Sequence, residues 1–144
     1  MKIDVFTLFP DWFEWFGQQR HVANAVAAGS EVRCLNYRET TPLGAGQVDD
    51  SPYGGGAGMV MRVDVVDKAL ETAYGHSGHR PRTVVLTPSG RMFDDELAVE
   101  LAQEPHIALL CGRYEGIDER VRELVATEEL SICLLYTSPS PRDS

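Results

Sequence analysis

Short apolar runs alternate along this chain with segments whose apolar residues recur at helical spacing. Four runs have the length of buried strands: Ile3–Phe9, Val32–Tyr37, Thr83–Thr87 and His106–Cys111. Helical spacing follows Asp11, Asp64 and Asp94, and it recurs from Ile117 to Val125. Strands that alternate with helices predict an α/β fold, with a mostly parallel sheet and helices on both faces.

Polar and glycine residues predict where the helices begin and end. Aspartate at a helix start can accept a hydrogen bond from a free backbone N–H group, so Asp11, Asp64 and Asp94 are expected to cap helices. Gly29 and Gly75 are expected to end the first two, and Gly17 to kink the first.

The first predicted helix is rich in aromatic residues, namely Trp12, Phe13, Trp15 and Phe16. Helical spacing against a sheet explains these side chains without a ligand, so we interpret them as core. A contact with a second subunit is the alternative, and base stacking is the least favoured interpretation.

Candidate chemistry first appears where the strand His106–Cys111 breaks at Gly112. Gly112 and Gly116 let the backbone adopt positive φ and approach a ligand closely. Arg113, Tyr114 and Glu115 lie between them and offer a cation, a ring and a carboxylate. A simple strand-to-helix turn with exposed charges explains this segment equally well.

A second glycine loop, Pro88–Arg91, follows the strand Thr83–Thr87. Ligands of open α/β sheets bind outside the carboxyl ends of the strands. If the two strands are neighbours, the Thr87–Gly90 and Gly112–Gly116 loops can therefore line one pocket.

Residues 38–59 show almost no apolar periodicity and include four glycines within positions 54–58. No Gly-Lys-Ser/Thr follows, as a P-loop requires, and the segment does not join a strand directly to a helix, as a dinucleotide fingerprint does. A flexible linker is the alternative, but Pro52, Tyr53 and the pair Asp49-Asp50 are unlike a Gly/Ser spacer. We interpret the segment as a ligand-facing loop.

Composition restricts the class of protein. A chain of 144 residues fits one domain, and its net charge of −9 argues against non-specific nucleic-acid binding. Any RNA must therefore be held by local arginines or by parts of a protein that are absent here. No apolar run approaches the roughly 20 residues of a membrane span, which favours a cytoplasmic protein. Cys34, Cys111 and Cys133 lie far apart in the sequence and are expected to be reduced thiols. His76 and His79 are interpreted as part of a simple turn, so no metal site is predicted there.

Four blocks together resemble the bacterial tRNA (guanine-37-N1)-methyltransferases: Pro10, residues 49–61, Leu86–Arg91 and Cys111–Arg120. The resemblance spans residues 1–132. It implies a knotted, SPOUT-class α/β methyltransferase domain, a homodimer, S-adenosylmethionine as methyl donor, and tRNA as the substrate, methylated on N1 of guanine 37.

The resemblance also implies the site residues. Those that contact the donor are Leu86, Thr87, Pro88, Ser89, Gly90, Gly112, Tyr114, Glu115, Gly116 and Ile132. The charge of Glu115 suits either the sulfonium or a magnesium ion. Those that contact tRNA are Asp50, Pro52, Tyr53, Gly54, Gly55, Gly56, Gly58 and Arg113. Asp50 suits a guanine Watson–Crick edge, and Arg113 a phosphate or, alternatively, a surface ion pair.

The resemblance stops after Ile132, which is expected to enter the sheet. The family continues with Gly-Asp-Tyr, whereas residues 133–144 contain two X-Pro pairs and are interpreted as a non-native tail, with a divergent native terminus as the alternative. N1 of guanine carries a proton, so its methylation needs a general base. The family's aspartate base, its helping arginine and its C-terminal tRNA-binding domain fall beyond residue 132. No catalytic residue is therefore predicted here, and the 144 residues alone are expected to be inactive.

Two other functions remain open. A non-catalytic module that binds S-adenosylmethionine or RNA would share the same loops. A phosphate-binding α/β protein that uses residues 49–59 has only the glycines in its favour.

Overall fold

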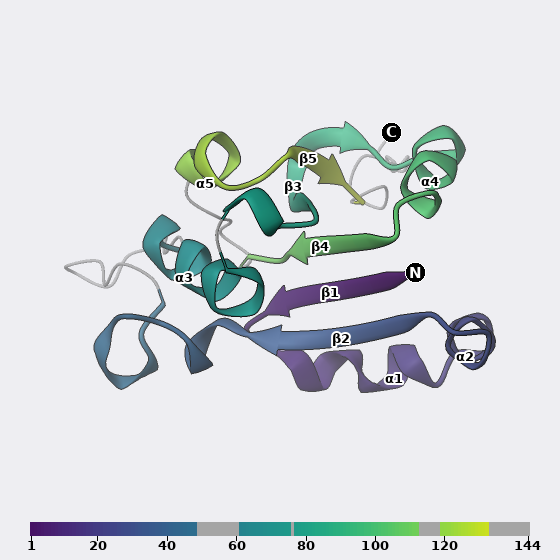
Figure 1. Cartoon of the computed structure of the whole chain (residues 1–144), viewed down its shortest axis with the longest axis horizontal. Coiled ribbons are helices and arrows are strands. Elements are labelled where there is room, and N and C mark those ends of the chain that lie inside the picture. The colour runs from purple at the N-terminus through teal and green to yellow at the C-terminus, as the bar shows by residue number, and fades with distance from the viewer. Residues whose placement is uncertain (49–60, 76, 113–118, 133–144) are drawn as a thin grey trace, which may run out of the picture.

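A computed structural model describes residues 1–48, 61–75, 77–112 and 119–132. Its five strands form one sheet in the order β2-β1-β4-β3-β5, and every neighbouring pair is parallel (Figure 1). The strands are β1 (Lys2–Thr7), β2 (Glu31–Asn36), β3 (Arg82–Met92), β4 (His106–Leu110) and β5 (Glu128–Ser131). The predicted parallel α/β sheet is confirmed.

Helices connect the strands and lie on both faces of the sheet. The α-helices are α1 (Glu14–Gly17), α2 (Arg20–Ala27), α3 (Val63–Tyr74), α4 (Asp95–Ala102) and α5 (Glu119–Leu124). Short 3-10 helices are η1 (Pro10–Phe13), η2 (Tyr37–Glu39), η3 (Gly44–Gly46) and η4 (Ser77–His79). Helices α3 and α5 cover one face, and α4 packs on the other. Among the described residues, no helix has the length and apolar character needed to cross a membrane.

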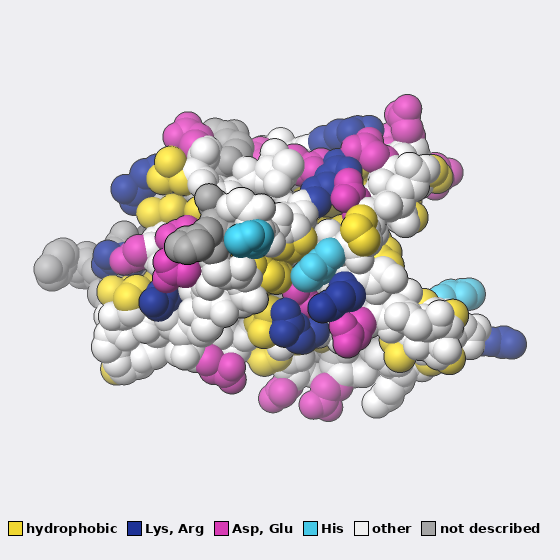
Figure 2. All heavy atoms as spheres, in the orientation of Figure 1, with side chains coloured by type: hydrophobic (Ala, Val, Ile, Leu, Met, Phe, Trp, Pro, Cys, Tyr) yellow, Lys and Arg dark blue, Asp and Glu magenta, His cyan; other side chains and the backbone are white. Residues whose placement is uncertain are grey.

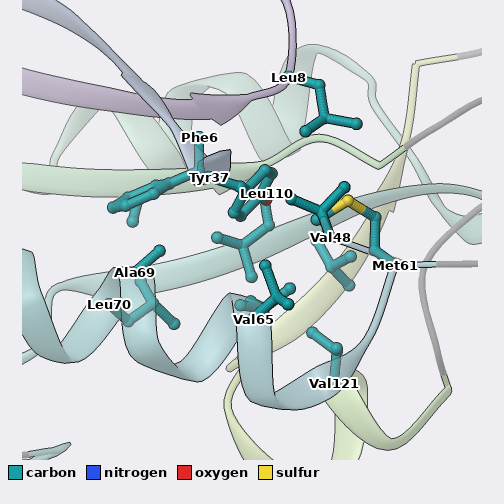
Figure 3. Packing of buried hydrophobic residues seen from close by; sticks show 13 residues of the cluster. Phe6, Leu8, Tyr37, Val48, Met61, Val65, Ala69, Leu70, Leu110 and Val121 are labelled. Carbon is teal, nitrogen blue, oxygen red and sulfur yellow. The ribbon is translucent and has the colours of Figure 1, made fainter. Parts of the chain in front are cut away.

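The larger core cluster lies between the sheet and helices α3 and α5. Phe6, Tyr37, Leu70 and Leu110 are each at most 1% exposed there, and their side chains meet between β1, β4 and α3 (Figure 3). The smaller cluster, on the α4 face, consists of Val84, Leu97, Leu101, Ile107 and Leu130. The central strand β4 contributes to both clusters, which explains its uninterrupted apolar sequence.

Only one of the three predicted aspartate caps forms. The Asp94 carboxylate accepts a hydrogen bond from the Leu97 N–H at 2.9 Å and caps α4. Asp11 instead lies inside η1, which Pro10 begins without a side-chain cap. Asp64 lies in the first turn of α3, where its carboxylate pairs with Arg62 rather than capping the backbone. The predictions for Asp11 and Asp64 are therefore wrong.

The interpretation of the first helix as core is wrong. Trp12 and Trp15 are 67% and 61% exposed, and Phe16 is exposed as well. The segment splits into the 3-10 helix η1 and the one-turn helix α1, which ends at the predicted break, Gly17. Because the two helices differ in residues per turn, the aromatic side chains do not share one face against the sheet.

Candidate functional site

The first part of β3 and the end of β4 lie side by side at the carboxyl edge of the sheet, next to β5. Val85 of β3 is paired with Leu110 of β4, and Leu86 of β3 is paired with Leu130 of β5. The segments that begin at Thr87 and Cys111 therefore leave the sheet from neighbouring strands. The two strands that lead into the glycine loops are therefore neighbours, as the pocket argument requires. That the loops line one pocket stays a prediction.

The first loop is an excursion within β3 and not the exit that the sequence predicts. Leu86 and Arg91 both pair with Leu130, so residues 87–90 leave the ladder between them and β3 then resumes to Met92. The Thr87 hydroxyl accepts a hydrogen bond from the Ser89 N–H at 3.4 Å. Pairing of the returning chain with β5 is a long-range effect that local turn signals do not reveal.

Gly90 allows this excursion to pass directly over β5. A Cβ atom at this position would lie 2.5 Å from the Leu130 backbone nitrogen and 2.7 Å from the Glu129 carbonyl carbon. Neither backbone atom can move without breaking the β3–β5 pairing, so only glycine fits. The loop and the end of β5 are consequently held together by steric contact.

An apolar cavity of about 350 Å³ lies on the α4 face of the sheet and extends from Met1 and Ile3, at the amino end of β1, to Leu86 and Ile132. Leu86 and Ile132, two predicted donor contacts, are part of its wall. The other lining residues are Met1, Ile3, Phe93, Ala98, Leu101, Ala102, Ile107, Leu109 and Leu130. Their sequence pattern does not mark these residues as ligand contacts, and the one nearby signal was Phe93, two residues after the predicted loop Pro88–Arg91.

Ile132 does not enter the sheet as expected. β5 ends at Ser131, which is paired with Met92 and whose carbonyl accepts the Phe93 N–H at 2.9 Å. Ile132 follows β5, is 55% exposed, and lies at the wall of the cavity. The ladder stops here because β3 itself ends at Met92.

The second loop begins at Cys111, whose backbone is held by a hydrogen bond to β1. The Cys111 N–H donates to the Phe6 carbonyl at 2.9 Å and so extends the β4–β1 pairing by one residue. Burial raises the pKa of the Cys111 thiol to about 11, and it also raises the pKa of Cys34. Both thiols are free and neutral at physiological pH, as the sequence predicts, and neither is suited to act as a nucleophile.

Several predicted site residues lie outside the described part of the chain. These are the donor contacts Tyr114, Glu115 and Gly116 and the tRNA contacts Asp50, Pro52, Tyr53, Gly54, Gly55, Gly56, Gly58 and Arg113. Within the described ranges, no three His, Cys, Asp or Glu side chains are grouped as metal ligands would be.

The residues on either side of the glycine-rich segment, Val48 and Met61, are part of the core. Val48 and Met61 are at most 1% exposed, and both belong to the large core cluster (Figure 3). The Arg62 N–H donates to the Val48 carbonyl at 3.1 Å. The residues on either side of the segment are therefore held next to each other.

Comparison with known proteins gives a consistent result. The family model of the tRNA (guanine-1)-methyltransferases matches residues 1–136. A tRNA (guanine-N(1)-)-methyltransferase of Bacillus cereus (strain AH820) is 43% identical over 133 residues, which cover 92% of this chain and 54% of that protein. The protein of the same name from Bacillus anthracis (strain CDC 684 / NRRL 3495) has the same identity and coverage.

The fold agrees with a solved structure as well. The crystal structure of tRNA (m1G37) methyltransferase from Aquifex aeolicus is similar with a TM-score of 0.75 at 34% sequence identity. The similar part covers 91% of this chain and 59% of that one. The present chain therefore spans about half the length of the curated relatives that it matches.

Proposed function

Because this chain belongs to the tRNA (guanine-1)-methyltransferase family, we propose that it is the donor-binding part of a tRNA-methylating enzyme. The complete enzyme would transfer a methyl group from S-adenosylmethionine to N1 of guanine 37, next to the anticodon. The observation that carries this proposal is the convergence of the β3 excursion, the β4 exit and the end of β5 at one edge of the sheet. A tRNA substrate would place the protein in the cytoplasm.

The described residues fit an adenosine-containing donor. Leu86 and Ile132 offer apolar side chains for a ring, and the backbone of residues 87–90 and Gly112 offers hydrogen-bonding groups. S-adenosylmethionine supplies an electrophilic methyl group on a positively charged sulfur. We propose Glu115 as the carboxylate that faces this charge, with a magnesium ion as the alternative partner of the same side chain.

The reaction also needs a base, because a proton must leave N1 of guanine as the methyl group arrives. The described polar groups of the β3 excursion are the Thr87 and Ser89 hydroxyls, which are far too weakly basic for this role. We propose that an aspartate outside these 144 residues supplies the base, and that this chain alone transfers no methyl group.

We propose that residues 49–60, between the anchors Val48 and Met61, contact the tRNA around the target base. Asp50 would accept hydrogen bonds from the Watson–Crick edge of guanine. Replacing Asp50 with Ala in a catalytically complete protein should raise KM for tRNA or lower kcat while leaving donor affinity unchanged. A loss of donor binding would contradict this assignment.

We also propose a homodimer that uses the surface of η1, α1 and α2. None of the α2 residues is buried, although Val22, Ala25 and Val26 share one of its faces. The chain has a net charge of −9, but it contains no Asp, Glu or Lys from Trp15 to Ser30. Depletion of charge together with exposed tryptophan is typical of the centre of a protein interface.

Sedimentation analysis tests the dimer with two variants of matched exposure. Trp15 and Val99 are each 61% exposed, but Val99 lies on α4, away from the proposed interface. Trp15→Glu should convert the dimer to a monomer, whereas Val99→Glu should leave it intact. A wild-type monomer at high concentration, or equal dissociation of both variants, would refute the dimer proposal.

The proposed activity can be tested with a chimera in which residues 1–132 are followed by the remaining part of the Bacillus cereus relative. This protein should transfer labelled methyl groups to unmodified tRNA with guanine at position 37 and not to the same tRNA with adenine there. A folded chimera that binds the donor but methylates neither tRNA would contradict the proposal.

A further inference from the structure

Tyr37 is the largest fully buried side chain of the structure's described residues, and it lies just beyond β2 at the carboxyl edge. Its ring packs against Phe6 with centroids 6.1 Å apart, and its side chain points into the cluster beside Leu110 (Figure 3). The ring thus lies under the point where β4 ends and the Cys111–Gly112 backbone begins.

The hydroxyl group of Tyr37 is buried without a well-formed hydrogen bond to any described residue. It lies close to the backbone of Cys111, and its burial raises the pKa well above its ordinary value. The hydroxyl is therefore a neutral O–H group that still needs an acceptor. A buried polar group without a partner is costly, and phenylalanine would fill the same space without that cost.

The local backbone limits which acceptor the hydroxyl can use. The Cys111 N–H already donates to the Phe6 carbonyl, so the amide at this point is fixed by the sheet. The backbone that continues from Cys111 into Gly112 is no longer part of β4, which ends at Leu110. A rotation of the peptide between Cys111 and Gly112 would therefore turn a carbonyl oxygen without breaking the β4 pairing.

We propose that Tyr37 is a positioning residue for the donor site, whose hydroxyl pairs with the Cys111–Gly112 backbone when that backbone adopts its donor-bound conformation. The unpaired hydroxyl destabilises the free protein, and donor binding recovers the missing hydrogen bond. This role rests on the proposed function, because it requires that Gly112 contact the donor. Tyr37 itself touches no reacting atom.

The test is Tyr37→Phe, which removes only the hydroxyl oxygen. Calorimetric titration of the 144-residue chain with S-adenosylhomocysteine should show binding about tenfold weaker than in the wild type, as the loss of one hydrogen bond predicts. The Tm of the free variant should be unchanged or raised by up to about 5 °C, because an unpaired buried group has been removed. A structural role alone cannot lower affinity while preserving or raising Tm.

Tyr74→Phe is the matched control. The Tyr74 hydroxyl donates to the Asp4 carboxylate, far from the carboxyl edge, so this variant should have a lower Tm and unchanged donor affinity. Unchanged affinity in Tyr37→Phe, or a lowered Tm in that variant, would overturn the role of Tyr37. A wild-type chain that fails to bind the donor would overturn the donor site as well, so the two failures are distinguishable.

Discussion

The two edges of the sheet differ in how their polar groups are paired. At the amino edge, Asp4 is 1% exposed and its carboxylate accepts hydrogen bonds from three side chains. Arg33 binds both oxygens at 3.1 and 3.0 Å, His106 Nε2 lies 2.8 Å from Oδ2, and the Tyr74 hydroxyl donates to the same oxygen. This Asp4 network connects β1, β2, β4 and the end of α3.

A second network lies at the same edge. Arg82, at the start of β3, pairs with Glu128 at the start of β5, with Glu100 of α4, and with Glu104 just after that helix. Figure 2 shows basic, acidic and histidine side chains side by side near the middle of one face of the molecule. The amino edge therefore joins strands and helices through long-range, mutually paired charges.

The carboxyl edge has the opposite character. It carries the unpaired Tyr37 hydroxyl, an excursion that leaves the β3–β5 ladder, and the exposed Ile132, which forms part of the wall of the apolar cavity. Polar groups that lack internal partners remain available to a ligand, at a cost in stability. The comparison indicates that the amino edge stabilises the fold, whereas the carboxyl edge is arranged for binding.

The largest effect on this contrast should come from Asp4→Ala. The change leaves the partly buried donors of Tyr74 and His106 without an acceptor, while the half-exposed Arg33 can turn to water. We expect a loss of about 3 kcal/mol in the free energy of unfolding, measured by chemical denaturation. Donor affinity of the remaining folded protein should not change.

Glu71→Ala is the control for Asp4→Ala. Glu71 pairs with Lys68 on the exposed surface of α3, so its removal should cost less than about 0.5 kcal/mol. Equal losses in the two variants would show that the Asp4 network has no special role.

A smaller loss of stability, but a complete loss of donor binding, should follow Gly90→Ala. The added Cβ would overlap the β5 backbone at Leu130 and push the excursion away from it. Strain of this kind costs about 2 kcal/mol. Gly78→Ala, at a glycine with open space around it, should change neither quantity. If Gly90→Ala still binds the donor, residues 87–90 are not part of the donor site.

The smallest effect concerns pH. Burial by itself would raise the pKa of Asp4, but the hydrogen bonds from Arg33, Tyr74 and His106 lower it below its ordinary value of 3.8. A lowered pKa gives stability that is present above the unfolded value and is lost as the pH falls through the folded value. The stability difference between wild type and Asp4→Asn should therefore shrink as the pH falls from about 5 to about 3.

Denaturation curves across this pH range check the prediction. Glu128, whose pKa is lowered by its hydrogen bond with Arg82, titrates in both proteins and cancels in the difference. A difference that stays constant with pH would show that Asp4 does not titrate through its network.

The sequence was informative where structure depends on nearest neighbours in the chain. Apolar runs located β1, β2 and β4 to within two residues, and Asp94 was correctly predicted as a cap because its acceptor and donor are three residues apart. The strand-end argument also placed the loops that follow Leu86 and Leu110 on neighbouring strands, since parallel strands run to the same edge of the sheet.

Features that depend on distant residues were missed. Asp4 and His106 are 102 positions apart, so no local pattern marks their contact. The return of β3 after Gly90 depends on β5, and the exposure of Trp12 and Trp15 depends on how η1 and α1 divide the first helix. In each case the energy comes from tertiary packing, which periodicity does not encode.

The most direct test of the account is an amide chemical-shift titration of the isotope-labelled chain with S-adenosylhomocysteine. We predict that the perturbed amides are those of the carboxyl edge, namely Leu86, Thr87, Ser89, Gly90, Gly112 and Ile132. The amides of Asp4, Arg33 and His106, at the amino edge, should not shift. Perturbations centred on the amino edge, or none at saturating ligand, would contradict the assignment of binding to the carboxyl edge.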